Sequence, residues 1–177
     1  MGQKTILLVD DDPAHISLIQ RGLNRVCLGC QVDVVRNGTE AIDYLLACGS
    51  HAGRDPAPMP QLVLLDLTMP KLDGFQVLQV LRRVTIGDRF RLPPVVVFTA
   101  SRKRNDVSKA YRLGAQGFVQ KPGEFCELIE TLRLIVTYWL ELNEFPPACR
   151  FQKSHDDVRR SPVPPAGNPV SASAEKP

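Results

Sequence analysis

The amino-acid sequence predicts an α/β fold built on a five-stranded parallel sheet. Short apolar runs rich in Val, Ile and Leu alternate five times with amphipathic stretches up to about residue 142. The runs are apolar throughout, as in residues 95–98 (VVVF), which is typical of strands buried on both faces. Strands that alternate with helices in this way indicate βαβ units.

The elements follow from apolar spacing and from capping residues. The expected strands are residues 4–9, 31–36, 61–65, 95–98 and 117–120. The expected helices are residues 13–26, 39–47, 75–84, 106–113 and 124–142. In the first helix, Asp12 can cap the N-terminus and Pro13 suits the first position. Ile16, Ile19 and Leu23 then recur at helical spacing, which predicts the buried side of that helix.

The composition predicts one folded domain and a tail. The chain has 177 residues, 44% of them hydrophobic and 23% charged, as in an ordinary globular domain with some excess length. Residues 1–145 are the expected domain. Residues 146–177 are rich in Pro, Ser and Ala without hydrophobic periodicity, so we expect this segment to be largely disordered.

Several classes of location and partner are disfavoured. No apolar run is long enough to span a membrane and the N-terminus does not resemble a signal peptide, so we expect a cytoplasmic protein without a membrane partner. The net charge of +3 and one short basic run at residues 102–104 do not predict nucleic-acid binding. The five cysteines are expected to be reduced thiols, including Cys27 and Cys30 of a lone C-x-x-C at a helix end.

Polar residues stand where the predicted strands end. Asp10 and Asp11 follow the first strand, Asp66 the third, Thr99 the fourth and Lys121 the fifth. In open parallel sheets the carboxyl ends of the strands form the ligand-binding edge, so these residues are expected to converge.

Three converging carboxylates require a hard cation, and Mg2+ fits because it takes oxygen ligands and bridges carboxylates to phosphate. With that charge neutralised, Asp66 can attack phosphorus and form an acyl phosphate. Lys121 can supply a cation, and Thr99 a hydroxyl donor, to the phosphoryl oxygens. The backbone carbonyl of Thr68 is a further candidate metal ligand.

The residues at these strand ends lie in longer motifs. The segments are residues 7–11 (LLVDD), 63–74 (VLLDLTMPKLDG), 98–100 (FTA) and 114–122 (GAQGFVQKP). They resemble the receiver domain of two-component response regulators, over about residues 4–142.

The resemblance implies a flavodoxin-like, doubly wound fold with strand order 2-1-3-4-5 and phosphorylation of Asp66 by a histidine kinase. It implies Mg2+ held by Asp11, Asp66 and the Thr68 carbonyl, with Asp10 acting through water. It further implies a switch in which Thr99 moves toward the phosphoryl group and Phe118 turns inward behind it. The product of such a protein is a signal, so we expect a phosphoacceptor and not an enzyme.

The end of the last helix carries a second, narrower resemblance. Residues 138–147 (YWLELNEFPP) are similar to the ending of small response regulators that serve phytochrome photoreceptor kinases. Those proteins are commonly homodimers, so the resemblance implies a phytochrome-type kinase partner and an interface that includes Tyr138, Trp139 and Phe145. A downstream phosphotransfer or target protein is a further possible partner. The alternative for Trp139 is that it folds back onto its own sheet.

Two other functions remain open at the level of the sequence. An aspartyl-phosphate phosphatase could use Asp10 and Asp12, but a second acidic pair after Lys121 is missing and Asp66 would have no role. A receiver-like interaction module without phosphorylation is disfavoured, because a scaffold has no physical need for a repulsive acid cluster.

Overall fold

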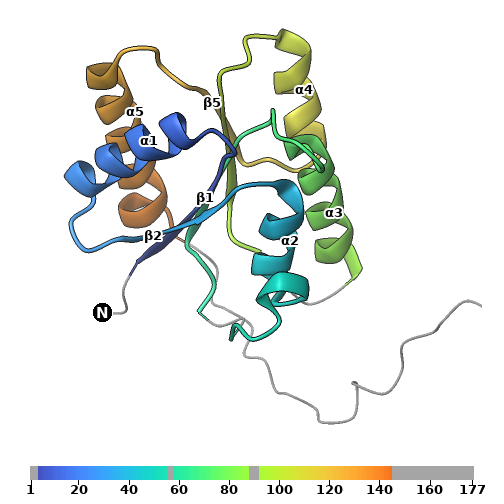
Figure 1. Cartoon of the computed structure of the whole chain (residues 1–177). Coiled ribbons are helices and arrows are strands. Elements are labelled where there is room, and N and C mark those ends of the chain that lie inside the picture. The colour runs from blue at the N-terminus through green and yellow to red at the C-terminus, as the bar shows by residue number, and fades with distance from the viewer. Residues whose placement is uncertain (1–3, 56–57, 88–91, 145–177) are drawn as a thin grey trace, which may run out of the picture.

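The computed structural model describes residues 4–55, 58–87 and 92–144, without the side chains of residues 85–87. Strands and helices alternate along the chain (Figure 1). The strands are β1 (Thr5–Val9), β2 (Gln31–Val35), β3 (Leu62–Leu65), β4 (Val95–Thr99) and β5 (Gly117–Gln120). The helices are α1 (Pro13–Val26), α2 (Gly38–Leu46), the 3-10 helix η1 (Gly49–His51), α3 (Gly74–Gly87), α4 (Arg104–Arg112), α5 (Phe125–Thr137) and the π-helix η2 (Tyr138–Leu142).

The five strands form one parallel sheet in the order β2-β1-β3-β4-β5. This confirms the predicted strand order and the flavodoxin-like fold. The strand order changes direction between β1 and β3. After β1 the chain runs outward to the edge strand β2, and it then crosses back to form β3 on the other side of β1. Ligand sites in such sheets form at this reversal, beyond the carboxyl ends of the strands.

Two layers of helices cover the sheet (Figure 1). Helices α1 and α5 lie on one face, and α2, α3 and α4 lie on the other. Successive strand residues point to opposite faces, so Ile6, Leu8 and Phe98 pack with α1 and α5, whereas Leu7 and Val9 pack with the other three helices. Both layers are apolar, which explains why the strand sequences are apolar throughout.

The first helix forms as its sequence predicts. The Asp12 side chain accepts a hydrogen bond of 2.8 Å from the Ala14 N–H, and Pro13 occupies the first turn. Ile16, Ile19 and Leu23 are buried. The N-cap supplies an acceptor to an N–H group that has no partner within the helix, so the helix can begin directly after the acidic residues of β1.

Several boundaries differ from the prediction. Helix α3 extends to Gly87, helix α4 begins at Arg104, and the loop after α2 contains η1. The last helix is α-helical only to Thr137 and continues as the π-helix η2, in which the Asn143 N–H donates to the Tyr138 carbonyl. Each difference involves hydrogen bonds at an element's end, which propensity predicts poorly.

The expectation that Cys27 and Cys30 are separate reduced thiols is wrong, because the structure joins their sulfur atoms in a disulfide. Cys27 caps α1 and Gly29 adopts a left-handed φ of 85°, so the chain turns back at once toward β2. The turn brings the two Cα atoms to 5.5 Å. The sequence pattern alone did not show that the turn would be this tight.

Within the described ranges, no helix is both long and apolar enough to cross a membrane. The predicted tail and the interface candidate Phe145 lie outside the described residues.

Candidate metal and phosphate site

The pairing of β1 with β3 places two acidic residues side by side. The last pair in this register is Val9 with Leu65, and each strand is followed at once by an aspartate, Asp10 and Asp66. The Asp66 N–H donates to the Val9 carbonyl over 2.9 Å, which continues the strand pairing up to the site. Backbone hydrogen bonds of the sheet therefore set the spacing of the two carboxylates.

Asp11 joins them to form an acid cluster. One carboxylate oxygen from each of Asp10, Asp11 and Asp66 lies within 4.8 Å of the others. Asp10 is 1% exposed and Asp66 is 7% exposed, so neither charge is well solvated. The Asp66 Oδ1 atom is buried and accepts no hydrogen bond from any residue that the structure describes. A buried anionic oxygen that accepts no hydrogen bond depends on nearby positive charge.

A hard divalent cation fits this donor set. The cluster offers only carboxylate oxygens, which Mg2+ prefers, and Asp66 Oδ1, which accepts no hydrogen bond from the described residues, is suited to bind one. Burial raises the pKa of Asp10, and the nearby Lys121 ammonium opposes that effect. An acid so deeply buried gains from any further positive charge placed against it.

Lys121 lies against two of the acids. Its Nζ atom donates to Asp10 Oδ2 over 2.6 Å and stands 3.4 Å from Asp66 Oδ1. Only 7% of the Lys121 side chain is exposed, so the ion pair is weakly screened. The Lys121 N–H donates to the Thr99 carbonyl over 2.8 Å, which ties the lysine to the end of β4. The structure therefore places the Lys121 ammonium beside Asp66, where the sequence predicts it.

Thr99 is 1% exposed at the end of β4. Its Oγ1 accepts from the Ser101 N–H over 3.3 Å, and the Ser101 hydroxyl donates to Asp106 Oδ2 over 2.5 Å. The threonine is thereby connected through Ser101 to the first turn of α4. Sequence reasoning missed Asp106, because the contact depends on how the loop between β4 and α4 folds.

The remaining predicted residues lie in the loop after β3, on β5 and at the end of the last helix. Thr68 is exposed in the loop after β3, and nothing in the structure tests its carbonyl as a ligand. Phe118 is half-buried on β5 and packs against the core on the α4 side. Tyr138 is 52% exposed. Trp139 is half-buried and packs against the core shared by α1 and α5, as the alternative for this residue expects.

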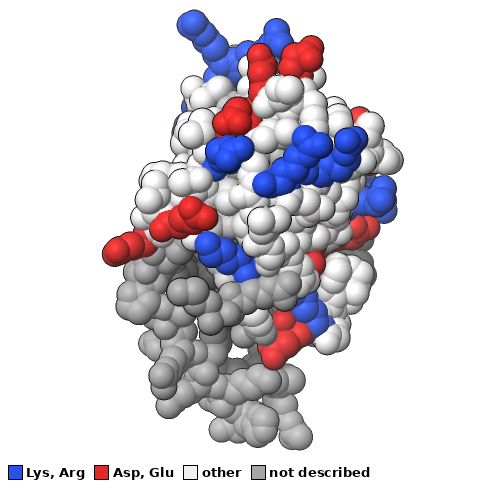
Figure 2. Space-filling view, turned by 90° about the vertical axis from the view of Figure 1, so that its left-hand side faces the viewer, with Lys and Arg blue, Asp and Glu red and all other residues white. Residues whose placement is uncertain are grey.

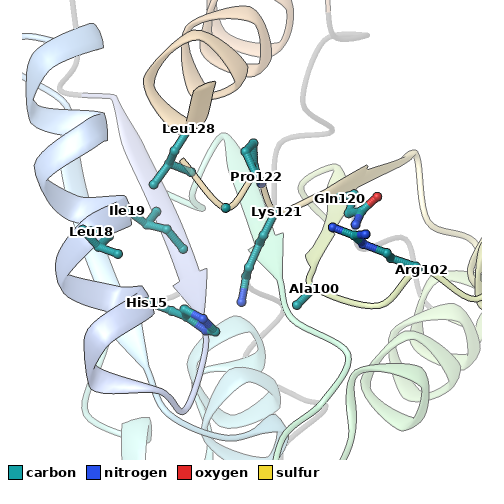
Figure 3. Close-up of a pocket in the computed structure, with 10 residues that line it drawn as sticks. His15, Leu18, Ile19, Ala100, Arg102, Gln120, Lys121, Pro122 and Leu128 are labelled. Atoms are coloured by element: carbon teal, nitrogen blue, oxygen red, sulfur yellow. The ribbon is translucent and has the colours of Figure 1, made fainter. Parts of the chain in front are cut away.

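A pocket of about 260 Å3 adjoins the acids (Figure 3). Its walls come from α1, from the loop after β4 and from the loop after β5, and three basic side chains line it: His15, Arg102 and Lys121. His15 Nδ1 lies 3.5 Å from Asp12 Oδ2 and 3.9 Å from Asp10 Oδ1. The i,i+3 spacing of Asp12 and His15 on a capped helix was the signal that could have identified His15. Through His15 and Lys121 the pocket is connected to the acid cluster.

Comparison with known proteins agrees with this geometry. The family model of the response regulator receiver domain matches residues 6–133. The probable methanogenesis regulatory protein FilR2 of Methanothrix harundinacea is 38% identical over 141 residues, which cover 80% of this chain and 86% of FilR2. Response regulator Rcp1 of Synechocystis is 32% identical over 145 residues, 82% of this chain and 95% of Rcp1.

Solved structures show the same likeness. The crystal structure of the Mn2+-bound form of Rcp1 aligns with a TM-score of 0.69 over 81% of this chain and 99% of that one, at 32% identity. The phosphorylated cyanobacterial phytochrome response regulator RcpA aligns with a TM-score of 0.72 over 82% of this chain and 100% of that one, also at 32% identity. With its matching fold and its aspartates, threonine and lysine at the strand ends, this chain belongs to the response regulator receiver family.

Proposed function

We propose that this receiver domain accepts a phosphoryl group on Asp66 from a histidine kinase and passes the signal on by a change of its surface. The observation that supports this most directly is the buried Asp66 Oδ1, which accepts no hydrogen bond from the described residues and has Lys121 Nζ 3.4 Å away. A nucleophile needs a free oxygen, and phosphoryl transfer needs nearby positive charge.

In the proposed reaction an Asp66 carboxylate oxygen attacks the phosphorus of a phosphohistidine. The new O–P bond forms as the P–N bond breaks, and the imidazole leaves with its electron pair. Asp10, Asp11 and Asp66 would hold Mg2+, with the Thr68 carbonyl as an added ligand. When bound, this ion supplies positive charge to the phosphoryl oxygens. The chain's own chemistry is confined to gaining and losing this one phosphoryl group, as expected of a signalling protein.

Lys121 and Thr99 are proposed to sense the phosphate. Lys121 now pairs with Asp10 at 2.6 Å and can shift toward the phosphoryl oxygens near Asp66. The Thr99 hydroxyl can rotate from its contact with the Ser101 N–H to donate to another phosphoryl oxygen. Both movements pull on loops that lead into α4 and α5, with Phe118 on β5 following by repacking. The signal would thus reach the surface of α4, β5 and α5.

The first prediction tests the acceptor. The full chain incubated with a small acyl phosphate and Mg2+ should take up one phosphoryl group, measured by intact mass and lost in mild base. Asp66→Asn should take up none, because an amide does not attack phosphorus. Asp73→Asn is the matched control, since Asp73 lies in the same loop but its carboxylate caps α3 by accepting the Gln76 N–H. Uptake by Asp66→Asn would place the acceptor elsewhere.

We further propose that the donor is a phytochrome-type kinase of the cytoplasm. The support is the likeness to RcpA, whose name identifies it as a cyanobacterial phytochrome response regulator, together with the motif of residues 138–147. The second prediction is that phosphorylated phytochrome kinases transfer phosphate to this chain faster than histidine kinases with other sensor domains do. Radiolabelled transfer at equal kinase concentrations would measure this, and equal rates from both classes would contradict it.

The extended last helix is proposed to pair with a second copy of the chain. Leu134, Tyr138 and Leu142 recur at a spacing of four residues and are 71%, 52% and 69% exposed. Figure 2 looks onto the side where α1 and α5 lie, and charged groups of both signs are scattered there with uncharged surface between them. A stripe of exposed apolar side chains is a suitable centre for an interface. The stripe replaces Trp139 as the proposed anchor.

A further inference from the structure

The turn between α1 and β2 holds two cysteines that phosphoryl transfer does not use. The Cys27 N–H caps α1 by donating to the Leu23 carbonyl over 2.8 Å, and the Cys30 N–H donates to the Cys27 carbonyl over 3.2 Å. Their Cα atoms are 5.5 Å apart, within the range of about 4.4 to 6.8 Å that a disulfide requires. The turn is therefore shaped to hold the two sulfur atoms together.

We propose that Cys27 and Cys30 form a reversible dithiol–disulfide pair that reacts by exchange with a thiol or disulfide partner. The thiolate of one cysteine attacks a sulfur of the partner's disulfide, and that S–S bond breaks as one partner thiol leaves. The second cysteine then attacks the mixed disulfide and releases the other partner thiol. The pair loses two electrons and two protons, and the partner's disulfide becomes two thiols.

The surroundings of the two sulfur atoms suggest which cysteine reacts first. Cys27 packs against the core cluster between α1 and α5, and it lies at the C-terminus of α1, where the carbonyl dipoles disfavour a thiolate. Both cysteines are half-buried, but Cys30 lies outside the helix. Leu28 between them is 91% exposed, so the turn projects into solvent. Cys30 is accordingly the attacking thiol, and Cys27 closes the disulfide.

The bond ties an edge strand to a helix. Among the described strands, β2 pairs with β1 alone, and its first residue donates from the Gln31 N–H to the Lys4 carbonyl over 2.7 Å. Reduction removes the covalent tie next to this hydrogen bond, so the start of β2 should open more readily. The pair stands at the amino ends of the strands, opposite the acid cluster, so its redox state should leave phosphate uptake unchanged.

The test uses the full chain in which the other three cysteines, Cys48, Cys126 and Cys149, are replaced by serine. The protein is equilibrated with mixtures of reduced and oxidised glutathione, and free thiols are counted by alkylation and mass spectrometry. We expect both thiols to be lost together without a glutathione adduct, and a dithiol reductant to restore them. Cys27→Ser should instead take one glutathione on Cys30, faster than Cys30→Ser takes one on Cys27.

A chain that retains Cys126 is the reference, because that thiol is exposed on α5 and stands alone. Two outcomes would overturn the pairing. In one, Cys27 and Cys30 each take a separate glutathione at the rate seen for Cys126; in the other, both thiols stay free while Cys126 reacts. Amide exchange at Gln31 should quicken on reduction, and equal exchange in both states would overturn the tie to β2. None of these outcomes bears on Asp66, whose phosphate uptake is measured separately.

Discussion

At the acid cluster, the balance of charge among a few side chains determines what the site can bind. Asp10, Asp11 and Asp66 converge, and Lys121 is the cation in direct contact with two of them. Three carboxylates and one ammonium leave a net charge of −2 in a largely buried place. Such a cluster costs the folded protein free energy unless a cation is bound, and a divalent metal would neutralise it.

The raised pKa of Asp10 predicts how metal binding depends on pH. Burial is the main cause, so folded Asp10 takes up a proton at a higher pH than an unfolded Asp, whose pKa is about 3.9. At neutral pH this ionised carboxyl therefore destabilises the fold, and that cost falls away as pH drops through the folded pKa toward about 3.9. Mg2+ needs the ionised form, so its affinity should fall over the same range.

Calorimetric titration of Mg2+ at a series of pH values measures this third prediction. Asp12→Asn is the control, because Asp12 lies outside the cluster and the Ala14 N–H holds the pKa of its carboxyl below the usual value. The control should show the same pH profile as the natural chain. A constant Mg2+ affinity down to the pH at which an exposed Asp protonates would contradict the prediction.

Among the elements, the start of α3 is packed directly against the backbone of Asp66, the proposed phosphoacceptor. A Cβ placed on Gly74 would lie 2.3 Å from the Asp66 carbonyl oxygen and 2.8 Å from the Leu67 Cα atom. The Gly74 N–H also donates to the Leu67 carbonyl over 3.1 Å. Because both neighbours are backbone atoms, they cannot yield by a change of rotamer. The glycine is needed for this close approach.

The fourth prediction is that Gly74→Ala displaces the loop after β3. The crowding should lower the free energy of unfolding by roughly 1 to 3 kcal/mol, as overpacking does elsewhere, and should slow phosphate uptake because Asp66 shifts away from its partners. Urea unfolding and intact mass after exposure to an acyl phosphate measure the two effects. Gly53→Ala is the control, since no described atom beyond its own chain neighbours lies within 4 Å of its added Cβ. Equal unfolding free energies and equal rates of phosphate uptake in the two variants would refute the role given to Gly74.

For the whole molecule, the end of α5 with η2 is the proposed meeting point of two copies. The stripe of Leu134, Tyr138 and Leu142 is exposed. Trp139, in contrast, packs the π-helix against the core between α1 and α5. Helix α5 covers the same sheet face as α1 and follows directly from the Lys121 loop (Figure 1). A pull on that loop can therefore alter how the helix is presented to a partner.

The fifth prediction is that Leu134→Glu weakens the dimer. A carboxylate in the centre of an apolar interface would be desolvated without a partner, so the variant should have the mass of a monomer at concentrations where the natural chain is dimeric. Sedimentation with and without phosphodonor measures this. Leu28→Glu is the matched control, because Leu28 is 91% exposed in the turn before β2, away from the stripe. A dimer that survives Leu134→Glu would place the interface elsewhere.

Much of the fold and the outline of the site could be predicted before any coordinates. Apolar runs buried on both faces indicate central parallel strands, and the acids, threonine and lysine follow those runs directly. The less predictable features depend on loops and ends. The Ser101 contact with Asp106 and the π-helix after Thr137 both arise from local geometry that no residue pattern specifies.

The order of residues along the chain was enough to predict the parallel sheet and to propose Asp66 as the acceptor, because hydrophobic periodicity and strand-end chemistry are local properties. The register of β1 against β3, the buried oxygen of Asp66 and the inward packing of Trp139 required the assembled molecule. So did the meeting of Cys27 with Cys30. These features depend on distances between segments, and such distances exist only once the sheet has formed and the helices have packed on it.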